Sequence, residues 1–168
     1  MAFSYRKSLV SKDEPTLLYF IIDNSDVITI GDAIMINTDG HAVVATATEE
    51  VAGIAVTVVD KNGAKVAFDS GSVNTWTVAT DNETSAKKQV GIVVSKDALF
   101  SNDADDDLAV SNLLMFFDLT SESQISVSSA SDTSGQFQLI SLDPDGDGDA
   151  SKGLFKISES QFDPYAQQ

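Results

Sequence analysis

The sequence predicts an all-β fold, a compact β-barrel or β-sandwich of about ten short strands with extended termini and little helix. Short apolar segments, several of them alternating with polar residues, recur along the whole chain. Gly, Asn and Asp residues separate these segments at short intervals, and these residues favour turns. Hydrophobic residues make up 42% of the 168 residues, which is enough for a packed core and excludes a disordered acidic chain.

Three parts of the chain are expected. An N-terminal arm over residues 1–14 precedes one β-rich domain over 15–157, and a C-terminal extension follows over 158–168. Within the arm, Ala2–Val10, whose extended part is Ser4–Val10, is either the first strand of the domain or an element that binds another protein. An alternative division places a second small β-unit after residue 100.

Several central segments are apolar at nearly every position. A strand that turns one face to water alternates in polarity, so these segments are expected to be covered on both faces, by the domain itself or by another subunit. They are Leu17–Ile22, Ile54–Val59, Val90–Val94 and Leu113–Phe117. The stretch 73–79 instead alternates, and this pattern places Trp76 and Val78 on one face.

Two sequences with Asn, Asp and Gly predict hairpins. Residues 60–63, Asp-Lys-Asn-Gly, separate two apolar segments, and their Asn-Gly pair predicts a type I′ turn. Residues 37–40, Asn-Thr-Asp-Gly, separate two further segments in the same manner. The stretch Asn82–Lys88 is expected to form one or two helical turns with Asn82 as the N-cap.

The C-terminal part alternates more regularly. Ile125 and Val127 share one face of the segment 124–128, and Phe155 and Ile157 share one face of 154–158. Two acidic loops are expected between such strands, over residues 101–107 and 143–149. The charge is uneven, because residues 97–168 contain 14 acidic and only 2 basic side chains.

The net charge of −16 bears on partners. A surface this acidic repels phosphate backbones and anionic lipid headgroups, so neither a nucleic acid nor a membrane is an expected partner. The longest early apolar run, Leu17–Ile22, is far shorter than the roughly 20 residues that span a bilayer. The chain has no cysteine, which excludes disulfides and thiolate metal sites.

The segment Asp143–Asp149 resembles the first half of a calcium loop. Asp143, Asp145 and Asp147 occupy the positions of the first three alternating ligands and Gly148 follows at the turn. Asp149 adds a fourth carboxylate. The acidic residue that should complete the loop is Leu154. The segment is therefore either a weak Ca²⁺ site or a solvated turn, and Ca²⁺ is the one cofactor that the sequence suggests.

No sequence pattern of a known catalytic site is present, so an enzyme is not expected. His41 is the only histidine and adjoins a predicted turn, where an exposed loop residue is the simplest interpretation. The tripeptide Asn82-Glu83-Thr84 matches a glycosylation acceptor, a pattern that is common by chance.

Four segments resemble the small β-rich capsid decoration proteins of tailed phages, which are also called head-stabilising or cement proteins. They are Gly31–Ile36, Val51–Val56, the hairpin Asp60–Phe68 and Val90–Val94. The resemblance implies a β-barrel or sandwich, often a homotrimer, that binds the outer surface of an expanded capsid. Such a protein bridges neighbouring subunits of the major capsid protein. It would be made in the host cytoplasm and located in the virion.

In that role, the N-terminal arm is the expected capsid-binding element. Its residues would add a strand to a capsid sheet, and Arg6 and Lys7 would pair with capsid carboxylates. The candidate residues are Phe3, Ser4, Tyr5, Arg6 and Lys7.

Two other classes of function remain open. A calcium-dependent extracellular module that binds carbohydrate would use the Asp143–Asp149 loop, with Trp76 stacked on a sugar ring. A hydrolytic enzyme on a β-scaffold would need a nucleophile or base, and the sequence indicates none.

Overall fold

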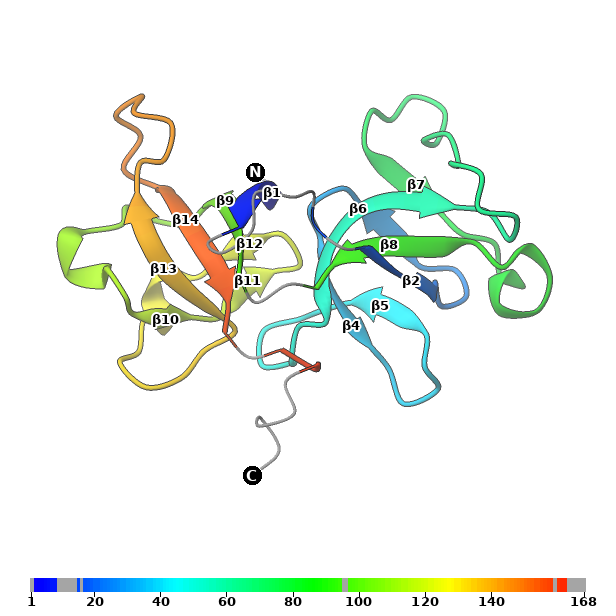
Figure 1. The fold of residues 1–168 in the computed structure, drawn as a ribbon, viewed down its shortest axis with the longest axis horizontal. Coiled ribbons are helices and arrows are strands. Elements are labelled where there is room, and N and C mark those ends of the chain that lie inside the picture. Colours follow the sequence, from blue (N-terminus) through cyan, green and yellow to red (C-terminus); the bar gives the residue numbers. More distant parts are fainter. Residues whose placement is uncertain (1, 9–14, 16, 95–96, 159, 163–168) are drawn as a thin grey trace.

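The computed structural model describes residues 2–8, 15, 17–94, 97–158 and 160–162 of the chain. Two five-stranded sheets and two two-stranded ribbons, all antiparallel, make up the fold of these residues. The two large sheets form two lobes that lie side by side (Figure 1). The expected all-β class is confirmed. The arrangement resembles a sandwich, and neither sheet closes into a barrel within the described residues.

Sheet I, in lobe I, has the strand order β2-β8-β6-β4-β5. Its strands are β2 (Leu17–Ile21), β8 (Gln89–Val93), β6 (Gly53–Val59), β4 (Ala33–Ile36) and β5 (Ala42–Val44). A ribbon of β3 (Val27–Thr29) and β7 (Thr75–Thr77) packs against it. Trp76 and Val78 are both buried in the core of this lobe, as their alternation predicts.

Sheet II, in lobe II, has the order β1-β9-β14-β13-β10. Its strands are β1 (Ser4–Ser8), β9 (Ala98–Asp103), β14 (Lys152–Ile157), β13 (Phe137–Leu142) and β10 (Phe116–Phe117). The ribbon of β11 (Leu119–Ser121) and β12 (Gln124–Ile125) completes the lobe. Sheet II therefore combines the N-terminal strand with strands that lie beyond residue 97.

Sheet I contributes to two hydrophobic cores because both of its faces are covered. Ile34, Val90 and Ile92 pack into the core of lobe I. Ile54 and Val93 point to the other side and join the core that contains Phe100 and Phe155 of sheet II. The two-sided apolar patterns of 54–59 and 90–94 are thus explained within one chain.

The described residues leave the other two apolar segments partly exposed, so their coverage by another subunit stays a prediction. Leu18 and Tyr19 in β2 are exposed, because β2 is the edge strand of sheet I. Leu113 and Leu114 are exposed in the loop before β10, which begins only at Phe116.

The two predicted hairpin turns are present, but their backbone differs from type I′. In the turn 60–63 only Gly63 has a positive φ, 81°, and its N–H donates to the carbonyl of Asp60. The Asp60 carboxylate accepts the backbone N–H groups of Asn62 and Ala64. This pattern is a type I turn followed by a glycine in the left-handed region. The turn after β4 repeats it, with the Asn37 side chain in the place of Asp60.

Within the described ranges, helical structure is limited to short turns, a π-helical turn at Asn82–Ala86 and 3₁₀ turns at Val110–Asn112 and Val127–Ser129. The expected capping role of Asn82 is wrong. Its side chain is buried and donates to the carbonyls of Ile22 and Lys88, at 2.6 and 3.2 Å. Because this amide is enclosed and used, Asn82 is not accessible for glycosylation.

The expected acidic loop 101–107 is shorter than predicted. Its first three residues belong to β9, a strand flanked by β1 and β14. Asn102 is buried there, donates to the carbonyl of Ser123 at 2.8 Å and accepts the N–H of Ile125 at 3.3 Å. These bonds satisfy a polar side chain inside the lobe, so its polarity does not mark a loop.

Candidate binding sites

The N-terminal residues form an edge strand of sheet II. Ser4–Ser8 pairs with β9, and a β-bulge at Arg6 interrupts the register. Phe3, which precedes the strand, is only 2% exposed. Its ring stacks on Phe137 with centroids 4.6 Å apart and meets Phe100 edge-on at 6.5 Å. Phe3 is therefore an anchor in the core of lobe II, and it is not displayed to solvent.

The remaining arm residues differ in exposure. Ser4 is exposed, and the half-buried Tyr5 ring meets Phe100 edge-on at 6.0 Å. The backbone of Lys7 pairs with Leu99, whereas its side chain lies outside the described part of the structure. Residues 1 and 9–14 of the expected arm also lie outside it.

A glycine makes room for the N-terminal residues. The N–H of Phe3 donates to the carbonyl of Gly31 at 3.1 Å. A Cβ at Gly31 would lie 2.3 Å from the Phe3 carbonyl oxygen, and the residue has a φ of +88°. Both the close approach and the backbone conformation require glycine here. Gly31 thus holds the residues before β1 against lobe I.

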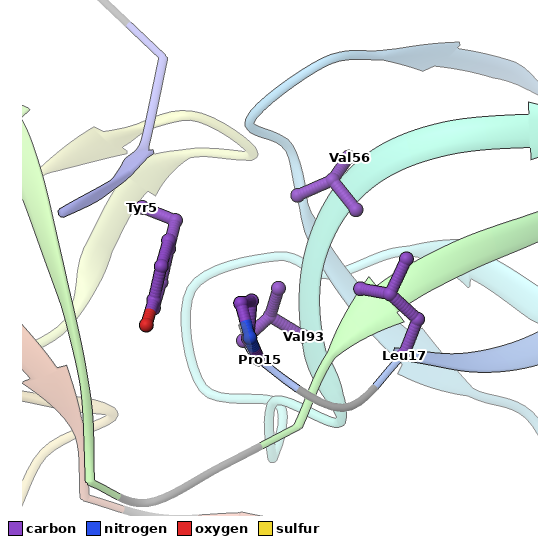
Figure 2. A pocket seen from close by; sticks show the side chains of 5 residues that line it. All are labelled: Tyr5, Pro15, Leu17, Val56 and Val93. Atoms are coloured by element: carbon purple, nitrogen blue, oxygen red, sulfur yellow. The ribbon is translucent and has the colours of Figure 1, made fainter. Parts of the chain in front are cut away.

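Two apolar cavities flank Tyr5 between the lobes. The first has a volume of about 390 Å³ and is lined by Tyr5, Pro15, Leu17, Val56 and Val93 (Figure 2). The second, of about 410 Å³, shares Tyr5 and Val56 and extends past Phe3 to Ile30. Side chains from β1 and sheet I face each other here without filling the space. These cavities offer apolar surface and few polar groups.

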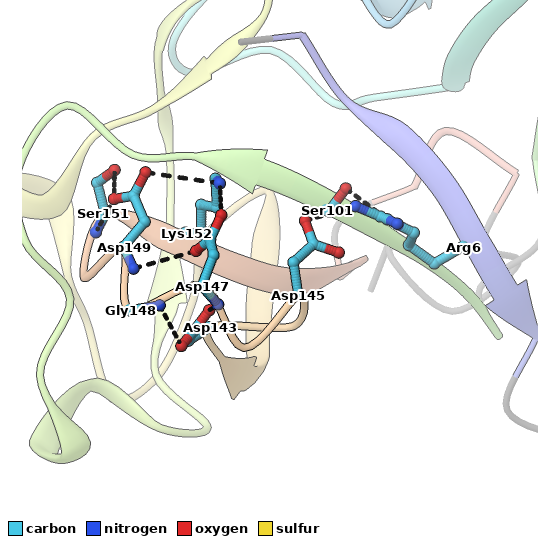
Figure 3. A network of polar contacts seen from close by, with 9 residues as sticks. All are labelled: Arg6, Ser101, Asp143, Asp145, Asp147, Gly148, Asp149, Ser151 and Lys152. Carbon is cyan, nitrogen blue, oxygen red and sulfur yellow. Dashed lines mark hydrogen bonds and ion pairs between the residues drawn. The ribbon is translucent and has the colours of Figure 1, made fainter.

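Arg6 is paired within its own chain. Its guanidinium donates to the Ser101 hydroxyl at 2.9 Å and to the Asp145 carboxylate at 2.8 Å (Figure 3). The expected pairing of Arg6 with another protein would therefore have to break this internal ion pair. Asp145 connects the loop 143–149 to the edge strand of sheet II.

The other carboxylates of this loop also have protein partners. Asp143 accepts the backbone N–H groups of Asp147 and Gly148, at 3.1 and 3.0 Å. The Lys152 ammonium contacts Asp147 and lies 3.7 Å from Asp149 (Figure 3). The hydrogen bond from Lys152 lowers the pKa of Asp147, and bonds from Ser151 lower the pKa of Asp149.

The four predicted calcium ligands are thus distributed over separate partners. Asp145 turns to Arg6, Asp143 to the backbone, and the other two to Lys152. Among the described residues, no group of three or more His, Cys, Asp or Glu side chains has the arrangement of a metal site.

A polar cluster that the sequence did not predict lies in lobe I. The carboxyl groups of Asp23 and Glu83 share a hydrogen bond, which lowers the pKa of Asp23 and raises that of Glu83. His41 Nδ1 is 3.4 Å from Glu83, and Asn37 donates to Asp23 at 2.8 Å. His41 is half-buried beside this pair and is not the freely exposed residue expected. No spacing signal links these residues, since three separate loops carry them.

Asp32 is a second unpredicted feature, because its carboxyl group is buried at the junction of the lobes. The residue is 3% exposed, and its carboxyl oxygen accepts the Thr29 N–H at 2.6 Å. Burial raises the pKa of Asp32 to about 7, and the charges of Glu122 and Asp26 add to the rise. The next residue, Ala33, donates its N–H to the carbonyl of Glu122 in lobe II.

Of the nine large apolar side chains that are exposed among the described residues, five lie in two loops, one in each lobe. The Val110 patch comprises Val110, Leu113 and Leu114, of which Val110 is 75% exposed. The Val73 patch comprises Phe68 and Val73, the latter 83% exposed. The loop between β9 and β10 projects from the outer end of lobe II, and the loop between β6 and β7 lies along the upper side of lobe I in this view (Figure 1). The two patches therefore lie on different lobes.

Comparison with protein-family models and with curated proteins finds no match for this chain. In the part of the chain that the structure describes, no helix has the length and apolar character needed to cross a membrane.

Proposed function

We propose that this chain is a structural virion protein that binds the outer surface of an expanded phage capsid. It stabilises the shell by bridging neighbouring subunits of the major capsid protein, as a homotrimer. The observation that carries this proposal is the pair of apolar patches on opposite lobes. A bridging protein needs two contact surfaces that reach different neighbours, and exposed apolar patches are typical of such contacts.

The positions of the family-like segments support the same function. Gly31–Ile36, Val51–Val56 and Val90–Val94 include all of β4 and parts of β6 and β8, which are adjacent strands of sheet I. Three of the four segments that carry the resemblance to decoration proteins thus lie on one continuous sheet, which supports the proposal.

The physical mechanism requires no chemical step. A protein that binds only the expanded shell lowers the free energy of that state by mass action. Several linked copies on one symmetry axis raise the effective concentration for each further contact. The net charge of −16 favours basic areas of the shell as the complementary surface.

Co-sedimentation tests this function. The purified chain is mixed with expanded and with unexpanded heads of the phage that encodes it, and the pellets are compared. We expect binding to expanded heads alone. The double substitution Val110→Ser with Leu114→Ser, and separately Val73→Ser, should each reduce the bound fraction at least tenfold.

Leu18→Ser is the matched control, since it makes the same chemical change at an exposed residue outside both patches. It should sediment like the unchanged protein. Equal binding to both head forms, or undiminished binding of both patch variants, contradicts the proposal.

A further inference from the structure

The first two strands of the chain, β1 and β2, belong to different sheets. β1 pairs with β9 in sheet II, whereas β2 pairs with β8 in sheet I. Residues 3 and 5 pack on Phe100 of lobe II. The chain therefore passes from one lobe to the other between Ser8 and Leu17.

The place that β1 occupies is a preformed acceptor for an extended segment. It consists of the edge of β9 that β1 covers, the rings of Phe100 and Phe137 that contact Phe3, and the carbonyl of Gly31. Ser101 and Asp145 receive the arginine that follows. These features match the order of residues 3–6, which are an aromatic residue, a small residue, a second aromatic residue and an arginine.

Around Tyr5 the side of β1 that faces lobe I is loosely packed, whereas Phe3, just before the strand, packs closely on Gly31. The two cavities of about 390 and 410 Å³ lie there, and both are lined by Tyr5. β9 is the only strand paired with β1 among the described residues. Release of the strand breaks the ladder with β9, the contacts of Arg6 and the buried contacts of Phe3, but no central strand of either sheet is disrupted. A second copy restores all of these contacts.

The chain length permits a second copy to supply the strand. Nine peptide units join Ser8 to Leu17, and such a stretch spans at most about 30 Å. Exchange of an identical terminal element between two copies keeps every contact of that element, so it costs little free energy.

We infer that β1 is an exchangeable strand, and that residues 2–8 of one copy can occupy the acceptor on lobe II of a second copy. The incoming Phe3 contacts the rings of Phe100 and Phe137, and the incoming Arg6 reaches Asp145. The partner is thus a second copy of this chain. This inference concerns the purified protein and does not rest on capsid binding.

The absence of cysteine makes a disulfide test direct. Ser4 and Ser101 are cross-strand partners in the register of β1 and β9, a separation that suits a disulfide. One full-length variant carries Ser4→Cys and another carries Ser101→Cys with a different affinity tag. The two are mixed under native conditions, oxidised, and analysed for covalent heterodimer by non-reducing electrophoresis.

We expect heterodimer at least tenfold above that from Ser4→Cys mixed with Ser70→Cys, an exposed position in lobe I. Adding Phe3→Ala to the Ser4→Cys chain should remove the excess, and Phe3→Leu should restore part of it. A double variant that carries Ser4→Cys and Ser101→Cys in one chain reports disulfide formation within a monomer. If that variant closes while the mixed pair yields no more heterodimer than the control pair, the exchange of β1 is excluded.

Discussion

Asp32 is a carboxylic acid in a position from which water is nearly excluded. Its pKa of about 7 in the folded protein exceeds the ordinary value of 3.8. The folded state therefore retains a proton that the unfolded chain releases between these two values. Linkage then requires that the free energy of unfolding falls as the pH rises toward 7, by about 4 kcal/mol in total for a shift of this size.

We expect Asp32→Asn to reduce this pH dependence. The neutral amide still accepts the N–H of Thr29, and it adds no charge beside Glu122 above pH 7. In urea unfolding, the free energy of unfolding should fall less between pH 5 and pH 8 for the variant than for the unchanged protein. Asp39→Asn, at an exposed turn position, is the control. An equal loss in all three proteins contradicts the role of Asp32.

Gly31 allows a separate test, because the chain offers a matched glycine. Gly31 and Gly40 have similar φ values, +88° and +82°, so an alanine strains the backbone comparably at both. Only at Gly31 would the new Cβ collide with Phe3, whereas nothing lies within 4 Å at Gly40. Gly40→Ala should cost about 1–2 kcal/mol. Gly31→Ala should cost clearly more in urea unfolding, and equal losses would refute the packing of Phe3 against this turn.

At the scale of elements, the loop 143–149 is held by cations of the protein itself. Lys152 and Arg6 contact carboxylates that a calcium ion would need. We therefore expect the same thermal midpoint in 5 mM Ca²⁺ as in EDTA, within about 1 °C, since a ligand that does not bind the folded state does not stabilise it. A higher midpoint in Ca²⁺ would restore the calcium interpretation of this loop.

The charge of Lys152 should matter more than that of its neighbour in β14. Lys152→Gln leaves Asp147 and Asp149 close together without their shared cation, so the midpoint should fall. Lys156→Gln removes a charge of the same strand from a different position and serves as the control. The comparison uses differential scanning calorimetry at low salt, and equal midpoints would show that the pairing contributes no net stability.

The sequence predicts some elements well because their signals are local. β4 and β6 combine apolar residues with turn formers such as Gly40 and Gly63 in the turns that follow them. β9 was missed because Asn102 has polar partners, Ser123 and Ile125, that only the folded lobe brings near. The type I′ prediction failed at residues 60–63 because the Asp60 carboxylate stabilises another turn.

The candidate sites were less predictable for the same reason. The arm residues were named from their place at the chain end, and the structure adds that Phe3 is enclosed by lobe II. The Asp23–Glu83 pair with His41 and the buried carboxyl of Asp32 depend on contacts between remote loops. Exposed apolar residues such as Val110 are distinguished from core residues only by three-dimensional burial.

At the scale of the whole molecule, the net charge of −16 opposes the compact state. Screening of this repulsion by salt should stabilise the fold. We expect the thermal midpoint to rise between 10 and 200 mM NaCl, a range in which the Debye length falls from about 30 Å to below 10 Å. A falling midpoint would indicate that the ion pairs of Arg6 and Lys152 outweigh the general repulsion.

Sheet I belongs to the packing of both lobes, since its two faces line different cores. Loss of either core would expose one face of sheet I, which also lines the other core. Unfolding of one lobe should therefore destabilise the other. Heating should consequently melt the molecule in a single calorimetric event whose van't Hoff and measured enthalpies agree. Because sheet I packs in both cores, we also expect a force applied to lobe II to be transmitted through sheet I to lobe I.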